Sequence, residues 1–130
     1  MADYSDKSLR DKLGYHDGMS VQLIHAPGDY VREVGIKSAG YNDAESGYDF
    51  IHAFYTDKSD FAASAWLLTS KLADDGMLWV SWPKQSSGVK TDLGEQDLRD
   101  ALLPLGVVDT KVCAVDDTWS ALKFVWRKDY

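Results

Sequence analysis

Three short apolar runs constrain what this chain can fold into more than any other feature. They are residues 21–26 (VQLIHA), 49–55 (DFIHAFY) and 77–82 (MLWVSW). Uninterrupted apolar runs of this length are typical of β-strands that are covered on both faces, as in parallel sheets. Neighbouring parallel strands need a crossover connection, which is usually a helix. The runs therefore predict an α/β domain.

A helix is predicted between the second and third apolar runs. Over residues 58–73, apolar side chains recur at the three- and four-residue steps of one helical face. They are Phe61, Ala65, Leu68 and Leu72. The Asp-Asp-Gly sequence at 74–76 is expected to end this helix before the third strand begins.

Shorter helices are expected elsewhere in the chain. One is predicted at 8–14, where Ser8 is a good N-cap and Gly14 a good stop. A second is predicted at 29–34, and a third begins near Asp92 and Glu95, whose spacing resembles a capping box, and runs to residue 102.

The chain is expected to end in a hairpin. Residues 107–115 and 121–126 are apolar and β-branched, and the polar link at 116–118 suits an antiparallel turn. The full order predicts one Rossmann-like α/β domain over residues 1–130, with a mostly parallel sheet, a C-terminal antiparallel hairpin and an N-terminal helical appendage at 1–18.

Composition excludes several classes of function. The chain has 130 residues, a formal net charge of −7, three histidines and one cysteine. The acidic balance argues against nucleic acid or an anionic membrane as a partner. One cysteine and three scattered histidines argue against a metal site. No segment resembles a signal peptide or a membrane span, so a cytoplasmic protein is expected.

Two resemblances extend this interpretation. An open sheet whose last helix is followed by a hairpin resembles the class I S-adenosylmethionine (SAM)-dependent methyltransferases, with part of the early sheet missing. More specifically, the chain resembles a family of small bacterial proteins known only as a domain of unknown function. The shared motifs are LG at 13–14, GM at 18–19, the AP-x-x-Y element at 26–30 and the WPK-x-SSG loop at 82–88. This second resemblance implies a fold but no activity.

The turn after the first strand differs from the methyltransferase pattern. That superfamily usually has an acidic residue followed by G-x-G-x-G, and here Ile24 lies at the acidic position and Ala26, Gly28 and Tyr30 at the three glycines. A tyrosine at the third position is expected to fill space that the methionine moiety uses. The ribose-binding acid has only Asp43 and Glu45 as candidates. We therefore expect that SAM does not bind, and the identity of any other cofactor stays open.

A ligand site is expected where parallel strands end, because their carboxyl ends share one edge of the sheet. Lys84 offers a charge there, and the serines and glycine of the WPKQSSG loop could cradle a small anion. The alternative is a solvent loop whose serines bond the local backbone. The candidate ligand-binding residues are Ala26, Gly28, Asp29, Tyr30, Asp57, Trp82, Lys84, Ser86, Ser87 and Gly88.

The remaining reactive and aromatic residues are expected to be structural. His25 and His52 lie in apolar runs and are predicted to be satisfied core histidines, and Cys113 is predicted to be a buried thiol. The side chains of four tryptophans are expected to pack in the core or on the sheet. They are Trp66, Trp79, Trp119 and Trp126.

Three functions remain open at this stage. The first is a methyltransferase-like domain that has lost catalysis and binds a small ligand or a protein partner, so that the chain is not an enzyme and has no catalytic residues. The second is an active minimal SAM-dependent methyltransferase. The third is a structural interaction module, which an exposed patch around Tyr30, Tyr41 and Tyr48 would favour. Oligomeric state is open.

Overall fold

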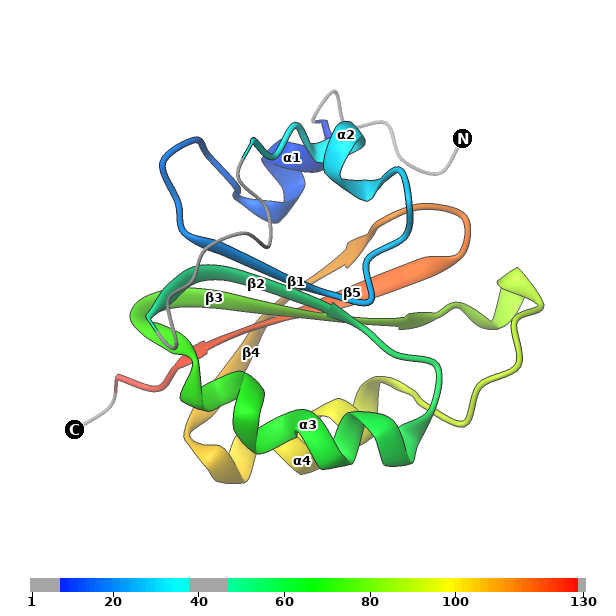
Figure 1. The fold of residues 1–130 in the computed structure, drawn as a ribbon. Helices are drawn as coiled ribbons and strands as arrows, with labels where there is room; N and C mark the ends of the chain where they lie inside the picture. The colour runs from blue at the N-terminus through cyan, green and yellow to red at the C-terminus, as the bar shows by residue number, and fades with distance from the viewer. Residues whose placement is uncertain (1–7, 38–46, 129–130) are drawn as a thin grey trace.

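The computed structural model describes residues 8–37 and 47–128, and it contains one mixed sheet (Figure 1). The strands are β1 (Val21–Ile24), β2 (Tyr48–Phe54), β3 (Leu72–Pro83), β4 (Val107–Ala114) and β5 (Trp119–Trp126). Their order in the sheet is β1-β2-β3-β5-β4. The first three strands are parallel, and β5 is antiparallel to both of its neighbours. The predicted α/β fold with a C-terminal hairpin is confirmed.

Helices cover both faces of this sheet. They are α1 (Leu9–Leu13), α2 (Tyr30–Val34), α3 (Lys58–Ser70) and α4 (Glu95–Leu102), with single 3₁₀ turns at Gln85–Ser87 and Leu103–Leu105. α1 and α2 lie on one face, and α3 and α4 lie on the other (Figure 1). None of the helices within the described ranges is long and apolar enough to cross a membrane.

Strand β2 lies at the centre of two apolar clusters. Phe50 and Phe54 face α1 and α2, whereas Ile51 and Ala53 face α3 and α4, and all four are buried. On the first face, Trp79 of β3 is fully buried and its indole N–H donates to the carbonyl oxygen of Leu13, 2.9 Å away. α1, in the segment that we expected to be an appendage, thus contributes Leu13 to the core.

β3 begins earlier than the sequence predicted. Residues 74–76 do not end α3 but lie inside β3. Tyr48 pairs with Leu72 and Phe50 pairs with Met77, so the residues between Leu72 and Met77 have no regular partners on β2. The strand bulges between these two pairings. A Cβ at Gly76 would lie 2.6 Å from the carbonyl oxygen of Tyr48, so this close approach requires a glycine.

The start of α4 is also displaced from the expected capping box. The Asp97 carboxylate accepts a hydrogen bond from the Gly94 N–H at 2.9 Å, two residues beyond the predicted pair. Asp92 instead accepts from the backbone N–H of Lys58 at 2.8 Å. It therefore links the α4 loop to the start of α3, a long-range contact that local spacing does not reveal.

A buried chain of polar side chains crosses the first face of the sheet. Tyr30 Oη lies 2.6 Å from His52 Nδ1, and His52 Nε2 lies 2.7 Å from Ser81 Oγ. All three residues are buried. Both ring nitrogens have hydroxyl partners, which donate or accept as the neutral tautomer requires. His52 is thus a satisfied core histidine, as predicted, with side-chain rather than backbone partners.

This burial predicts a dependence of stability on pH. Desolvation lowers the pKa of His52 from 6.5 to about 3. Below pH ~6.5 the imidazole of His52 therefore becomes protonated in the unfolded state but stays neutral in the folded state. The free energy of unfolding then falls by ~1 kcal/mol for each unit by which the pH is lowered. Urea unfolding between pH ~5.5 and ~6.5, where model Asp and Glu carboxyls are already largely ionised, measures this slope.

Two variants identify the group responsible. His52→Phe keeps an aromatic ring and is expected to flatten the slope, although it leaves Tyr30 and Ser81 without a ring partner and so lowers stability at pH 7 by ~1–3 kcal/mol. His16→Gln, which removes an exposed histidine, is the matched control, and the slope is compared between the two variants. An unchanged slope in His52→Phe contradicts the assignment.

Candidate functional site

The carboxyl ends of β1, β2 and β3 lie side by side at one edge of the sheet. The register pairs Ile24 with Ala53, and Ala53 with Val80, so all three strands end within a few residues of this line. The hairpin reaches the same edge, because the backbone N–H of Lys84 donates to the carbonyl oxygen of Thr118 at 2.8 Å. The carboxyl ends of the parallel strands therefore share one edge of the sheet, as predicted. We call this line the carboxyl edge.

His25, immediately after β1, has an unusual backbone. Its φ is +59°, the one positive value of a non-glycine residue among those described, and its side chain is exposed. Nδ1 lies 3.2 Å from the carbonyl oxygen of Phe54. A carbonyl only accepts, so Nδ1 carries the proton and Nε2 is left as an acceptor. Such strained residues cluster at functional sites.

The prediction that His25 is a core histidine is therefore wrong. It lies beyond the end of β1, with its ring edge-on to Tyr55 at a centroid distance of 5.5 Å. The apolar run VQLIHA contains no signal for this, because the partner of the His25 ring, the Phe54 carbonyl, lies on a different strand.

The turn at 26–29 is open to solvent. An added Cβ at Gly28 would meet no atom within 4 Å, and its φ is ordinary, so packing does not demand a glycine there. Asp29 is the N-cap residue of α2 but makes no side-chain capping hydrogen bond, and it is exposed. Ala26 is half-buried against the α1 and α2 cluster.

Tyr30 points away from this open space. Only 3% of it is exposed, and its ring packs edge-on to His52 and Phe54 beneath α2. Burial raises the pKa of its phenol, which stays protonated. The expectation that Tyr30 fills the space next to the strand end is wrong. The helical turn that begins at Tyr30 directs the side chain into the core instead.

Asp57, which follows β2, is the N-cap residue of α3. Its Oδ1 accepts hydrogen bonds from the N–H and the hydroxyl of Ser59 and from the N–H of Asp60. These bonds cap α3 and lower the pKa of the carboxyl. A shallow hollow of about 360 Å³ lies beside it, lined by Thr56, Asp57, Lys90, Thr91 and Asp92.

The WPKQSSG loop forms a self-contained 3₁₀ turn. Ser87 Oγ donates to the carbonyl oxygen of Lys84 at 2.6 Å and accepts from the N–H of Val89 at 3.1 Å. Gly88 ends the turn at a φ of +80°. Trp82 is half-buried against the α3 and α4 cluster, and Ser86 is exposed. Ser87 thus bonds the local backbone, as in the alternative interpretation of this segment as a solvent loop.

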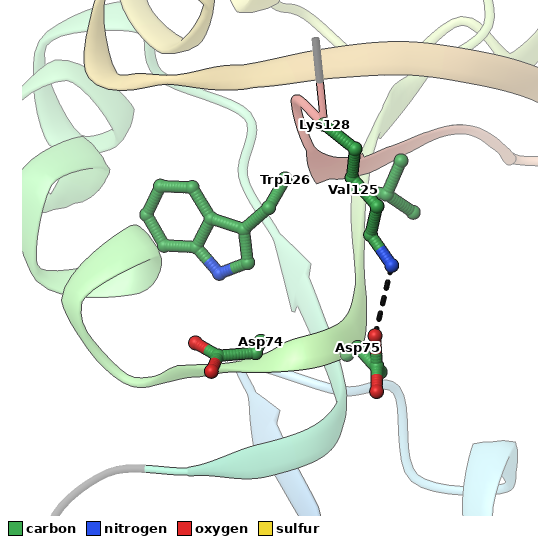
Figure 2. A pocket seen from close by; sticks show the side chains of 6 residues that line it. Asp74, Asp75, Val125, Trp126 and Lys128 are labelled. Atoms are coloured by element: carbon green, nitrogen blue, oxygen red, sulfur yellow. Dashed lines mark hydrogen bonds and ion pairs between the residues drawn. The ribbon is translucent and has the colours of Figure 1, made fainter. Parts of the chain in front are cut away.

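A second hollow lies at the opposite edge of the sheet (Figure 2). It has a volume of about 370 Å³ and is lined by Asp74, Asp75, Gly76, Val125, Trp126 and Lys128. The Lys128 ammonium lies 2.8 Å from the Asp75 carboxylate, and the indole N–H of Trp126 donates to the carbonyl oxygen of Leu72 at 3.4 Å. Sequence reasoning missed this hollow because it placed Asp74 and Asp75 in a turn.

Other residues are placed as follows. Cys113 is buried, as predicted. Tyr30 and Tyr48 are buried, so they form no exposed patch, and Tyr41, Asp43 and Glu45 lie outside the described residues. Trp79 is in the core, but Trp66 is 67% exposed, contrary to expectation. Within the described ranges, no group of histidine, cysteine and acidic residues could hold a metal ion.

Comparisons with known proteins give structural neighbours only. No family model and no curated protein matches the chain. A TehB-like SAM-dependent methyltransferase from Corynebacterium glutamicum has a TM-score of 0.58 at 9% identity, over 95% of this chain and 90% of that one. Magnesium protoporphyrin IX methyltransferase from Synechocystis, with bound SAH (S-adenosylhomocysteine), gives 0.57 at 13% identity, over 85% and 75%. These likenesses show a methyltransferase-like Rossmann fold.

The same neighbours correct two further expectations. We expected a domain that has lost catalysis and is not an enzyme, and we expected that SAM does not bind. The neighbours include SAM-dependent methyltransferases and complexes with SAM or SAH, which contradicts both expectations. The buried position of Tyr30 also removes the steric part of the argument for them. The alternative, an active enzyme, is the better supported hypothesis.

The two serines of the WPKQSSG loop give a matched test of its structural role. Ser87→Ala removes the bonds to Lys84 and Val89 and is expected to lower the free energy of unfolding by ~1 kcal/mol. Ser86→Ala, at an exposed position one residue away, should change it by less than ~0.5 kcal/mol. Urea unfolding measures both, and equal effects would contradict the assignment.

Proposed function

We propose that this chain is a small SAM-dependent methyltransferase that binds its cofactor at the carboxyl edge, against the turn at residues 25–29. The observation that carries the proposal is the open space at Gly28 on a fold shared with such enzymes. The finer resemblance, to the small bacterial family with the WPK-x-SSG loop, and a cytoplasmic location belong to the same proposal.

The turn fits the cofactor in shape. A ligand in a doubly wound sheet lies against the loops that follow the strands, and close approach to the backbone is possible only where side chains are absent. Gly28 leaves such a place, because a methyl group added to its Cα would meet no atom within 4 Å. Tyr30 is bonded to His52 in the core and does not enter this space.

The turn also fits the cofactor in charge. SAM carries a sulfonium cation and an ammonium group, and the chain has a net charge of −7, which attracts cations at long range. The exposed Asp29 carboxylate makes no capping bond and is available to accept hydrogen bonds from ligand N–H or O–H groups. When bound, the cofactor supplies an electrophilic methyl group.

His25 is the group in this turn that can take up a proton. The bond from Nδ1 to the Phe54 carbonyl fixes the ring and its tautomer, so Nε2 presents a lone pair at the exposed end of β1. A general base there would remove the proton of an acceptor hydroxyl, phenol or amine as the methyl group transfers. The carboxyl edge thus combines a cofactor turn and a proton acceptor.

The proposal predicts binding of SAM and SAH. Calorimetric titration is expected to give dissociation constants on the order of 1–100 μM. Gly28→Ala adds a Cβ that would meet no atom within 4 Å, so it should weaken binding and leave the melting temperature unchanged. The larger Gly28→Val should abolish binding. No heat from either ligand at ~1 mM, with wild-type protein, contradicts the proposal.

A second prediction separates proton transfer from binding. His25→Asn retains a residue that tolerates positive φ but removes the ring nitrogens. It should bind SAM as wild type does and lose at least ~100-fold in methyl transfer, measured as SAH released with a panel of phenols, alcohols and amines. Equal loss of SAM affinity would show that His25 holds the cofactor rather than a proton.

A further inference from the structure

The outward face of α3 is apolar between Ala62 and Leu67, and exposed serines flank this part at positions 59 and 70. Trp66 is 67% exposed and Leu67 is 48% exposed, and Ala62 and Ala63, one turn earlier, are exposed beside them. No charged residue occurs from Phe61 to Ser70, although 27% of the chain is charged. By contrast, α4 next to it exposes Gln96 and Asp100. We call Ala62, Ala63, Trp66 and Leu67 the α3 patch.

The inward face of α3 is apolar as well. Phe61, Ala65 and Leu68 are buried against the sheet. From Phe61 to Leu68 the helix has one polar side chain, Ser64, so this part of α3 is apolar on both its inward and its outward side. A helix with apolar side chains on both sides is typical of one that is covered on both. The sheet covers one side of α3, so the composition of the other side points to a second partner. Tryptophan is also among the residues most enriched at interface centres.

We propose that the α3 patch is covered by the α3 patch of a second copy of this chain, with the two helices antiparallel about a two-fold axis. A two-fold interface must be complementary to itself. The patch meets this requirement, because the large Trp66 lies one turn from the small Ala62 and Ala63. In the antiparallel pair, each indole packs over the partner's alanines.

Charges at the two ends of α3 select the antiparallel direction and a copy of the same chain. Asp57, Lys58 and Asp60 lie at its amino end, where the Lys58 ammonium is paired with the Asp97 carboxylate of α4 at 3.1 Å. Lys71 follows its carboxyl end. Antiparallel helices place the acidic end of each beside the lysine of the other, and their dipoles also oppose. A parallel pair would bring like charges together.

The size of the patch sets the expected affinity. α3 has 13 residues and is about 20 Å long, so a contact between two such faces lies at the lower end of specific interfaces. The dimer is therefore expected to be weak, with a dissociation constant on the order of 10 μM. It does not depend on the methyltransferase proposal, since the patch faces away from the sheet.

Sedimentation velocity of the full chain from ~1 to ~300 μM tests this proposal. Wild type is expected to shift from monomer to dimer over this range. Trp66→Glu and, independently, Leu67→Lys should remain monomeric at every concentration with unchanged melting temperature, because neither side chain is in the core. Val112→Glu, at an exposed valine of β4, is the matched control and should dimerise as wild type does.

A charge swap tests the orientation. Asp60→Lys and Lys71→Glu are each expected to weaken the dimer about 5-fold, and the double variant should recover wild-type affinity. A wild-type chain that stays monomeric up to ~300 μM overturns the proposal, whatever else binds the patch. A Val112→Glu effect as large as that of Trp66→Glu also overturns it, and failure of the double variant to recover overturns the antiparallel arrangement.

Discussion

The hydrogen bond between Tyr30 and His52 determines how the candidate site is arranged. His52 lies on β2, an interior strand next to β1, and the 2.6 Å bond from its ring to the Tyr30 hydroxyl fastens the start of α2 to the sheet. Residues 25–29 are thereby held between this anchor and the end of β1. The sequence predicted that Tyr30 would fill the space of the cofactor. In the structure this tyrosine instead holds the turn in place and leaves its outer side open.

The sheet and its helices could be predicted because the signals are local. Apolar runs identified β1, β2 and the hairpin, and the spacing of Phe61, Ala65 and Leu68 identified α3. For the candidate site, the sequence predicted only that it lies at the carboxyl edge of the sheet. The side chains of His25 and Tyr30 both have their hydrogen-bond partners in β2, more than twenty residues away in the chain. Local propensity holds no information on such contacts.

Errors at β3 and α4 have the same origin. Asp-Asp-Gly is a turn signal by composition, but here the bulge opposite Tyr48 accommodates it within the strand. Asp92 resembled a cap by spacing, but its carboxylate binds Lys58 of another helix. In each case a residue that favours a local turn or helix cap makes a tertiary contact instead. The free energy of that contact exceeds the preference for the turn or cap, which is less than ~1 kcal/mol.

The position of β1 links the fold to the proposed activity. In the doubly wound order the first strand lies inside the sheet, with further strands beyond it. Here β1 is at the end of the sheet formed by residues 8–37 and 47–128 and pairs only with β2. A cofactor at the turn after β1 therefore contacts less protein on its outer side than in a wider sheet. Its affinity then depends on the turn itself, where Gly28 provides space and Asp29 provides charge. A substitution at either position therefore lowers the affinity for the cofactor more than it would in an enclosed site.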